Sequence, residues 1–218
     1  DKYLVPQLIY QGSFYSQLQD KFHRINNNFY TSINTLYKFS PKISAKVNAG
    51  VYADRLTRQN RTFTEYNIGG QEFTITETEG LRKKPTIYNG ALQLIYKVSD
   101  SLNLEYSGKT HYEETGFRSH SNNNGIAQQN NVNTTNVFTK HNVNLTRRIN
   151  KNSAFTALAH YSLNRAPQDF LLFPGLALEG NDLISLQNNQ SSRFDKENVR
   201  LNLEYFIKHE DSKLQFTG

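Results

Sequence analysis

The chain has no cysteine, no methionine, no tryptophan and no long hydrophobic run in its 218 residues. Without cysteine there is no disulfide framework, no thiol nucleophile and no cysteine-based metal site. Without a run of about 20 apolar residues there is no transmembrane helix. Hydrophobic residues make up 36% of the chain and the mean hydropathy is −0.70. This composition does not fit an ordinary cytosolic enzyme.

Aromatic residues are nevertheless plentiful, with 13 Tyr and 14 Phe. The chain is therefore not a solvated disordered segment. A polar chain with many aromatic residues is typical of a sheet that has one apolar face and one wet face. The formal net charge is +6, but Lys and Arg are spread along the chain. No nucleic-acid partner is expected from that distribution.

Alternation with a period of two is the strongest pattern in the sequence. From Phe29 to Phe39, every second residue is aromatic, Ile or Thr, and the residues between are mostly polar. A tight turn is predicted at Ser40-Pro41-Lys42, after which the alternation resumes from Ile43 to Val51. This segment predicts a long antiparallel hairpin.

The same unit recurs along the chain, so the pattern predicts four hairpins. Long polar segments separate the hairpins and are expected to be loops. The turn centres are predicted near Pro41, Asp100, Lys151 and Glu210, and the loops at Thr57 to Pro85, Gly116 to Asn133, and Arg165 to Arg193.

These alternating runs are about twice the usual length of a globular strand. Strands of about 9–11 residues, short turns at one end and long loops at the other are typical of outer-membrane barrels. The expected fold is therefore all-β: an antiparallel transmembrane β-barrel with short periplasmic turns and long extracellular loops. Residues 1–26 are expected to form an extracellular loop or the end of a previous strand, and residues 27–218 the four hairpins. Because the last strand stops unfinished at Gly218, we expect about eight strands of a larger barrel.

The hairpins resemble the barrel of a TonB-dependent receptor, in the Asn- and Tyr-rich style of Bacteroidota. The resemblance rests on Asn89 to Tyr112, Asn142 to Pro167, and Asn198 to Phe216. It implies an outer-membrane location and energised uptake of a bulky nutrient such as a siderophore, glycan or peptide. It also implies contact with outer-membrane lipid, with TonB through an N-terminal part that this sequence does not contain, and with a capping surface lipoprotein.

Other functions fit the alternation as well. A barrel that serves as a scaffold in outer-membrane protein assembly or secretion would have no plug domain. A small complete barrel could act as an adhesin, and a soluble barrel also has one polar face. Alternation alone does not say which face is turned inward.

No enzyme activity, metal site or cofactor is expected from the sequence. The six His form no HxH or HExxH arrangement, and no Gly-x-Ser-x-Gly is present. The polar face is instead expected to line the lumen, where ordinary polar filling is the alternative to contact with a substrate. The lumen-facing candidates are Lys46, Asn48, Gln93, Lys109, His111 and His160.

Two further segments are candidate contact sites. The apolar stretch Phe170 to Leu186 lies in a predicted extracellular loop, where such an apolar segment is not expected. It is predicted to pack on neighbouring loops or to dock a lipoprotein partner. The basic run Arg82-Lys83-Lys84 near the predicted outer rim is a candidate contact for lipopolysaccharide phosphates, with solvated loop charge as the alternative. The residues of the apolar stretch singled out for packing or docking are Phe170, Leu171, Leu172, Phe173 and Leu176.

Overall fold

The computed structural model describes residues 27–123, 125–174, 187–209 and 212–217. Nine β-strands account for nearly all of these residues. Within this part of the chain, no helix is long and apolar enough to cross a membrane. The strands are β1 (Phe29–Ser40), β2 (Ile43–Ala53), β3 (Leu56–Ile68), β4 (Gln71–Ser99), β5 (Leu102–Asn123), β6 (Ile126–Arg148), β7 (Ser153–Phe173), β8 (Asn188–His209) and β9 (Ser212–Thr217).

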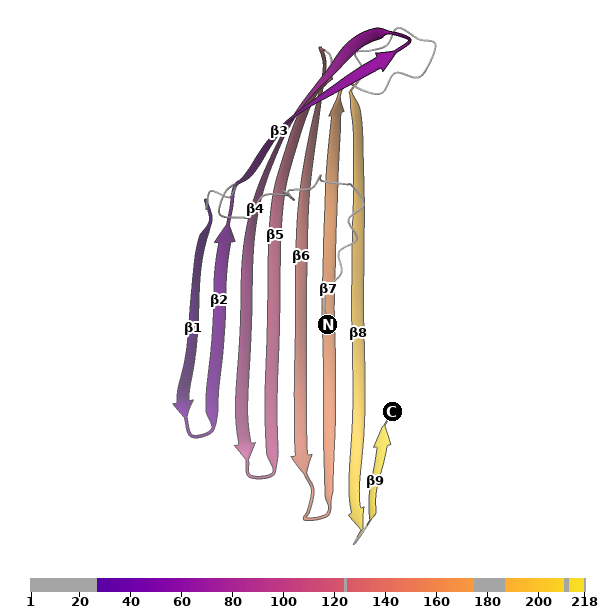
Figure 1. The fold of residues 1–218 in the computed structure, drawn as a ribbon. Helices are drawn as coiled ribbons and strands as arrows, with labels where there is room; N and C mark the ends of the chain where they lie inside the picture. Colours follow the sequence, from indigo (N-terminus) through magenta and orange to yellow (C-terminus); the bar gives the residue numbers. More distant parts are fainter. Residues whose placement is uncertain (1–26, 124, 175–186, 210–211, 218) are drawn as a thin grey trace.

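The strands form one antiparallel sheet in the order β1-β2-β4-β5-β6-β7-β8-β9, with β3 paired to β4 (Figure 1). Each strand pairs with its neighbour in sequence, so the topology is a simple meander apart from β3. Among the described strands the sheet is open, with β1 and β9 at its two edges. The all-β antiparallel class predicted from alternation is confirmed, and the sheet has the form of a barrel wall that has not closed.

Strands β2 and β3 behave as one strand with a short break. Ala53 on β2 lies opposite Thr86 on β4, and Leu56 on β3 lies opposite Lys83, so the register continues across the break. Asp54 keeps contact with the ladder through a 3.0 Å hydrogen bond from its backbone N–H to the carbonyl of Pro85. Side chains therefore continue to alternate between the two faces of the sheet from β2 into β3.

The short turns are where alternation predicted them. Hairpins turn at Pro41-Lys42, at Asp100-Ser101 and around Lys151, while the fourth predicted turn, near Glu210, lies outside the described residues. In the first turn the Ser40 hydroxyl accepts hydrogen bonds from the backbone N–H groups of Lys42 and Ile43. Such side-chain caps satisfy turn donors that the ladder leaves unpaired.

Each turn lies beyond the previous one along the sheet, as Figure 1 shows. The backbone of Lys97 bonds to Lys42 at the first turn, yet β4 continues to Ser99. In the same way, Lys208 bonds to Asn152 and β8 continues to His209. This stagger is the shear that tilted strands have in a barrel wall.

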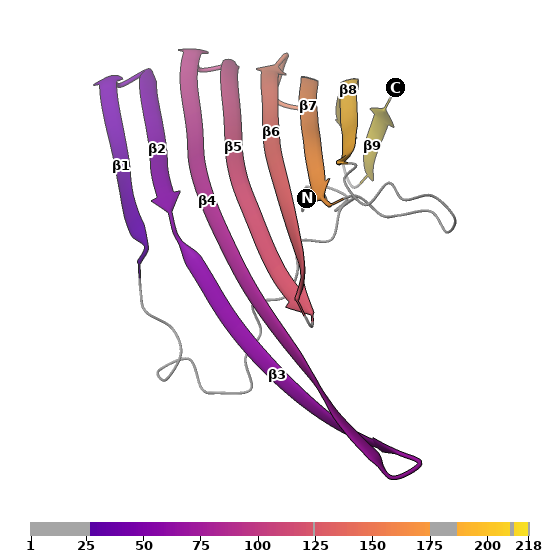
Figure 2. The same cartoon turned by 90° about the horizontal axis from the view of Figure 1, so that it is seen from above.

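The long polar segments are mostly strand, and their prediction as loops was wrong. Strands β3 and β4 cover almost all of the segment from Thr57 to Pro85 and meet only at Gly69-Gly70. These two glycines have φ of 62° and 83°, as a two-residue hairpin turn requires. Figure 2 shows this hairpin reaching far beyond the rest of the sheet. Polarity indicates where the apolar face ends, but Thr-rich and Asn-rich segments still pair as strands when a neighbouring ladder satisfies their backbone.

One small apolar cluster is buried outside the alternating region. Leu81, Phe117 and Val132 have 3%, 3% and 0% exposure, and Phe170 packs against them. Phe117 lies opposite Val132, and Val132 lies opposite Phe170, so the cluster crosses three strands in one row. The cluster packs together the parts of β4 to β7 that extend beyond the alternating region, away from the short turns; these parts are the outer extensions of the strands.

Candidate functional site

The polar face of the sheet carries all six lumen-facing candidates. Lys46 lies opposite Gln93, Asn48 opposite Ala91, and Ala91 opposite Lys109, so these residues share a face. The same register continues through β5 to β7 and brings His111 and His160 to that face. Whether this face lines a lumen stays a prediction, since the sheet is open.

A hollow of about 330 Å³ lies on this face across β1, β2, β4 and β5. Its floor is formed where small residues meet in one row, with Ser32 opposite Gly50. Its polar and aromatic lining includes Tyr30, Asn34, Asn48, Asn89, Lys109, His111 and Phe138. The mixture of amides, one amine and aromatic rings suits a polar solute with some apolar surface.

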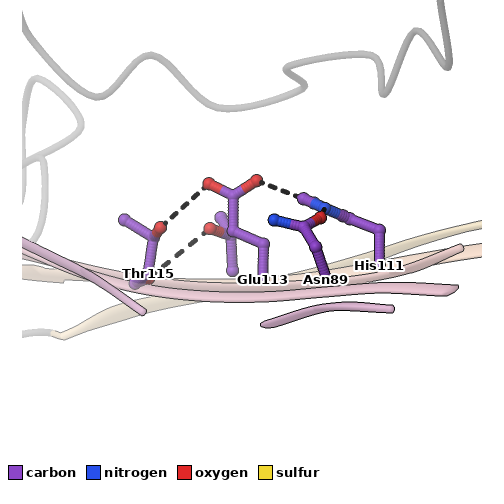
Figure 3. A network of polar contacts seen from close by, with 5 residues as sticks. Asn89, His111, Glu113 and Thr115 are labelled. Carbon is purple, nitrogen blue, oxygen red and sulfur yellow. Dashed lines mark hydrogen bonds and ion pairs between the residues drawn. The ribbon is translucent and has the colours of Figure 1, made fainter. Parts of the chain in front are cut away.

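One polar network borders the hollow (Figure 3). His111, which is 6% exposed, has Nδ1 2.7 Å from Oδ1 of Asn89 and Nε2 3.6 Å from Oε2 of Glu113. The hydroxyl of Thr115 donates to Oε1 of Glu113 at 3.2 Å. Glu113 therefore sits between a ring nitrogen and a hydroxyl, and when His111 is protonated the two form an ion pair.

Two further sets of hydrogen bonds lie on the polar face between β4 and β7. Gln93 donates to Glu105 at 2.7 Å, and the amide of Asn142 donates to Ser107 at 3.1 Å. The oxygen of the same amide lies 2.7 Å from Nδ1 of His160. Side chains so connected are held in fixed rotamers, which gives the polar face a defined surface.

The polar face offers hydrogen-bonding groups that could bind a solute. Among the residues that the structure describes, no three His, Asp or Glu side chains gather closely enough to hold a metal ion. Asn89, Glu113 and Asn142 join the networks but were not among the predicted site residues. Alternation puts Asn89 and Asn142 on the polar face, but only cross-strand register reveals which residues they meet.

The opposite face of the sheet is apolar and exposed. Large hydrophobic side chains on it include Ile33, Leu92, Leu94, Val199 and Leu201, all at least 36% exposed. Tyr88 and Tyr112 form a cross-strand aromatic pair with ring centroids 5.9 Å apart at the outer end of this band. At the turn end, Arg147 lies in one row with Phe155 and Tyr205. His141 is a polar residue in the middle of the band, opposite Gly108.

The start of the apolar stretch belongs to a strand. Phe170 to Phe173 form the end of β7, so their prediction as loop residues was wrong. Phe170 packs on the buried cluster and Leu172 is buried, whereas Phe173 is 50% exposed. Pairing with β8 and burial on the polar face keep this segment in the sheet. Leu176 and residues 175–186 lie outside the described residues, and docking of a lipoprotein stays a prediction.

No protein-family model matches this chain, and no curated protein sequence matches it. Among solved structures, the chain is similar to the ferric yersiniabactin uptake receptor FyuA from Yersinia pestis, at 8% identity and a TM-score of 0.49. That match covers 84% of this chain and 26% of the receptor. The chain is also similar to the RagAB peptide transporter, at 8% identity and a TM-score of 0.41, over 77% of this chain and 29% of that one.

The chain thus spans about a quarter of the length of the solved structures that it matches. With identities of 8%, the likeness concerns the fold alone. We therefore base the fold on the strand register described above.

Proposed function

We propose that this chain is a section of the wall of an outer-membrane β-barrel. One observation carries the proposal: a single register separates an exposed apolar face from a polar face across β1 to β8. On β5 the apolar band runs from Leu102 to Tyr112. The ten residue-to-residue steps, at about 3.3 Å each, span about 33 Å along the strand. A tilt of about 40° reduces this to roughly 25 Å, the usual height of the apolar band of such barrels.

We infer that the polar face lines the path of an energised receptor that imports bulky nutrients. The hollow and its networks support binding of polar solutes, and the hairpin pattern resembles TonB-dependent receptors of Bacteroidota. The substrate class would be a siderophore, glycan or peptide. A plug domain and a TonB-contacting segment would come from parts of the protein beyond this sequence. A surface lipoprotein and outer-membrane lipid are the further partners of this proposal.

Neighbouring positions on one strand test the membrane orientation. This chain has no native cysteine, so Leu92→Cys and Gln93→Cys introduce single thiols on opposite faces. In the intact protein reconstituted in vesicles, a fluorophore at position 92 should be quenched by nitroxide lipids. A fluorophore at 93 should be quenched by iodide instead. Equal quenching of both by iodide would mean a water-soluble sheet.

A second experiment tests the receptor class. The intact protein is recovered from outer membranes, run boiled and unboiled on a denaturing gel, and sequenced from its N-terminus. A heat-modifiable chain several times larger than 25.1 kDa that opens with a plug-like domain supports the receptor. A large chain without a plug would favour the assembly or secretion scaffold. A heat-modifiable band near 25.1 kDa would favour a small complete barrel.

A further inference from the structure

Two arginines face each other on the outward side of the sheet, beyond the apolar band. Arg82 on β4 lies directly opposite Arg118 on β5. They lie six residues beyond the Tyr88–Tyr112 pair, and because six is even they share its face. Six residues correspond to about 20 Å along the strand, or roughly 15 Å above the band at the tilt used above.

The charge of this pair is not compensated by any side chain that the structure describes. Like charges directly opposite each other in a sheet are destabilising. In the described part of the chain, neither guanidinium has an ion pair, and Nε of Arg82 is buried without a hydrogen-bond partner. The nearby Glu79 pairs instead with Arg58 on the other face, and Glu114 accepts the Tyr112 hydroxyl. An anion from outside the chain would satisfy both arginines.

A hollow of about 380 Å³ is present at this position. Gly80 accommodates the ring of His120, which lines the hollow, since a Cβ at this position would collide with that ring. Lys84 continues the basic surface one row nearer the apolar band, opposite Gly116. The polar lining of the hollow includes Arg55, Thr57, Gln59, Arg82, Arg118 and His120.

We propose that this hollow binds a phosphate group of lipopolysaccharide in the outer leaflet, a site that rests on the membrane orientation proposed above. Guanidinium groups bind phosphate through paired, charge-assisted hydrogen bonds, and two of them can hold one phosphate from both sides. The pair lies beyond the apolar band, on the polar side where lipopolysaccharide carries its phosphate groups. The pair also lies toward the end of the sheet that carries the long hairpin ends, and outer-membrane barrels turn that end to the exterior. A lipid anchored in the adjoining apolar band reaches the hollow without leaving the membrane.

The test compares lipid retention by the intact protein and two double variants. Arg82→Gln/Arg118→Gln removes both guanidiniums. Lys83, which the sequence groups with Arg82 and Lys84, lies opposite Phe117 on the polar face, away from the hollow. Lys83→Gln/Lys196→Gln therefore makes the same charge change on the polar face. Each protein is purified from outer membranes in mild detergent, and native mass spectrometry counts bound lipopolysaccharide. The arginine variant should retain at least tenfold less lipid than the wild type, and the lysine variant should retain as much.

Three further arms make the result decisive. Heat-modifiability on a gel reports whether each variant folds. If the glutamine variant does not fold, Arg82→Lys/Arg118→Lys replaces it. This lysine pair keeps the charge but loses the paired hydrogen bonds, so its retention of lipid should be intermediate. Dephosphorylated lipopolysaccharide should not be retained. Inorganic phosphate added to the lipid-bound protein should leave the lipid in place, because the apolar band also holds the acyl chains.

Equal retention by wild type and arginine variant would overturn the proposal, as would equal retention of intact and dephosphorylated lipopolysaccharide. If the protein were absent from the outer membrane and not heat-modifiable, the membrane orientation would fail instead. The two failures are therefore distinguishable.

Discussion

The hydroxyl of Tyr106 lies 2.7 Å from Nδ1 of His141 on the apolar face of the sheet. The other ring nitrogen, Nε2, lies 2.7 Å from the hydroxyl of Thr139. A neutral imidazole has one donor and one acceptor, and each hydroxyl can donate or accept, so both nitrogens are satisfied in either tautomer. The rings of Tyr106 and Tyr161 stack beside the imidazole at 6.0 and 6.2 Å. Alternation puts the polar residue His141 on the apolar face, and there Tyr106 and Thr139 satisfy both of its ring nitrogens.

Removing the Tyr106 hydroxyl should destabilise the protein. Tyr106→Phe leaves Nδ1 of His141 without a partner in apolar surroundings, at a cost of about 1–3 kcal/mol. Urea unfolding of the intact protein in lipid vesicles measures the change. Tyr96→Phe, on the same face, is the control, since no bond to its hydroxyl is present among the described residues, and it should be near neutral. An equal effect of both substitutions would show that His141 does not depend on Tyr106.

Gly108→Ala should act through the same Tyr106–His141 contact. A Cβ at this position would lie 2.5 Å from the Tyr106 hydroxyl and would push it away from His141. The expected loss is again about 1–3 kcal/mol, and in the double variant with Tyr106→Phe the two losses should not add. Gly116→Ala is the matched control, because its nearest contact is an ordinary 3.7 Å from Asn133. Additive losses in the double variant would separate Gly108 from the pair.

Adjacent positions on β8 should respond oppositely to a new charge. Leu201 is on the apolar face, opposite Ala159, and Asn202 is on the polar face, opposite Leu158. In a bilayer, Leu201→Lys should cost about 2–4 kcal/mol if the site is near the midplane, whereas Asn202→Lys should change little. Reversible folding titrations of the intact protein in lipid vesicles measure both. Equal costs would contradict the assignment of the two faces.

Truncating the buried cluster should loosen the outer extensions. Phe117→Ala removes a side chain that is 3% exposed and should cost about 3–5 kcal/mol of local stability. Hydrogen exchange should then accelerate in the outer parts of β4 to β7 and stay slow in the apolar band. Phe63→Ala is the comparison, since Phe63 is 58% exposed and its loss should cost about 0.5 kcal/mol or less. Faster exchange throughout the sheet would mean that the cluster is not a local fastening.

Much of the sheet could be predicted from the sequence because one face is apolar. The alternation from Phe29 to Phe39 and the break at Pro41 predict strand, face and turn together. Beyond the apolar band the same rule fails, because the residues of β3 are polar or mixed on both faces. There only the pairing with β4 indicates a strand, and pairing is not visible in one sequence.

For the polar site, the sequence predicts the face on which each residue lies. Alternation groups Lys46 with Asn48 and His111 with Lys109, and the register brings these residues to one face. It does not give the cross-strand partners of a residue, so the contacts of His111 with Asn89 and Glu113 were not foreseen. The Arg82–Arg118 pair was missed for the same reason, since the two residues are far apart in the sequence.

The unbroken register between β2 and β3 has a consequence for how this chain can change its length. One residue inserted at the break between Asp54 and Arg55 would turn every side chain of β3 to the opposite surface. The buried and exposed sides of the protruding hairpin would then be exchanged. Two inserted residues would return each side chain of β3 to its original surface. The pairing of β3 with β4 would then shift by two residues, which is one repeat of the alternation. Length variation at this joint should therefore occur in steps of two residues.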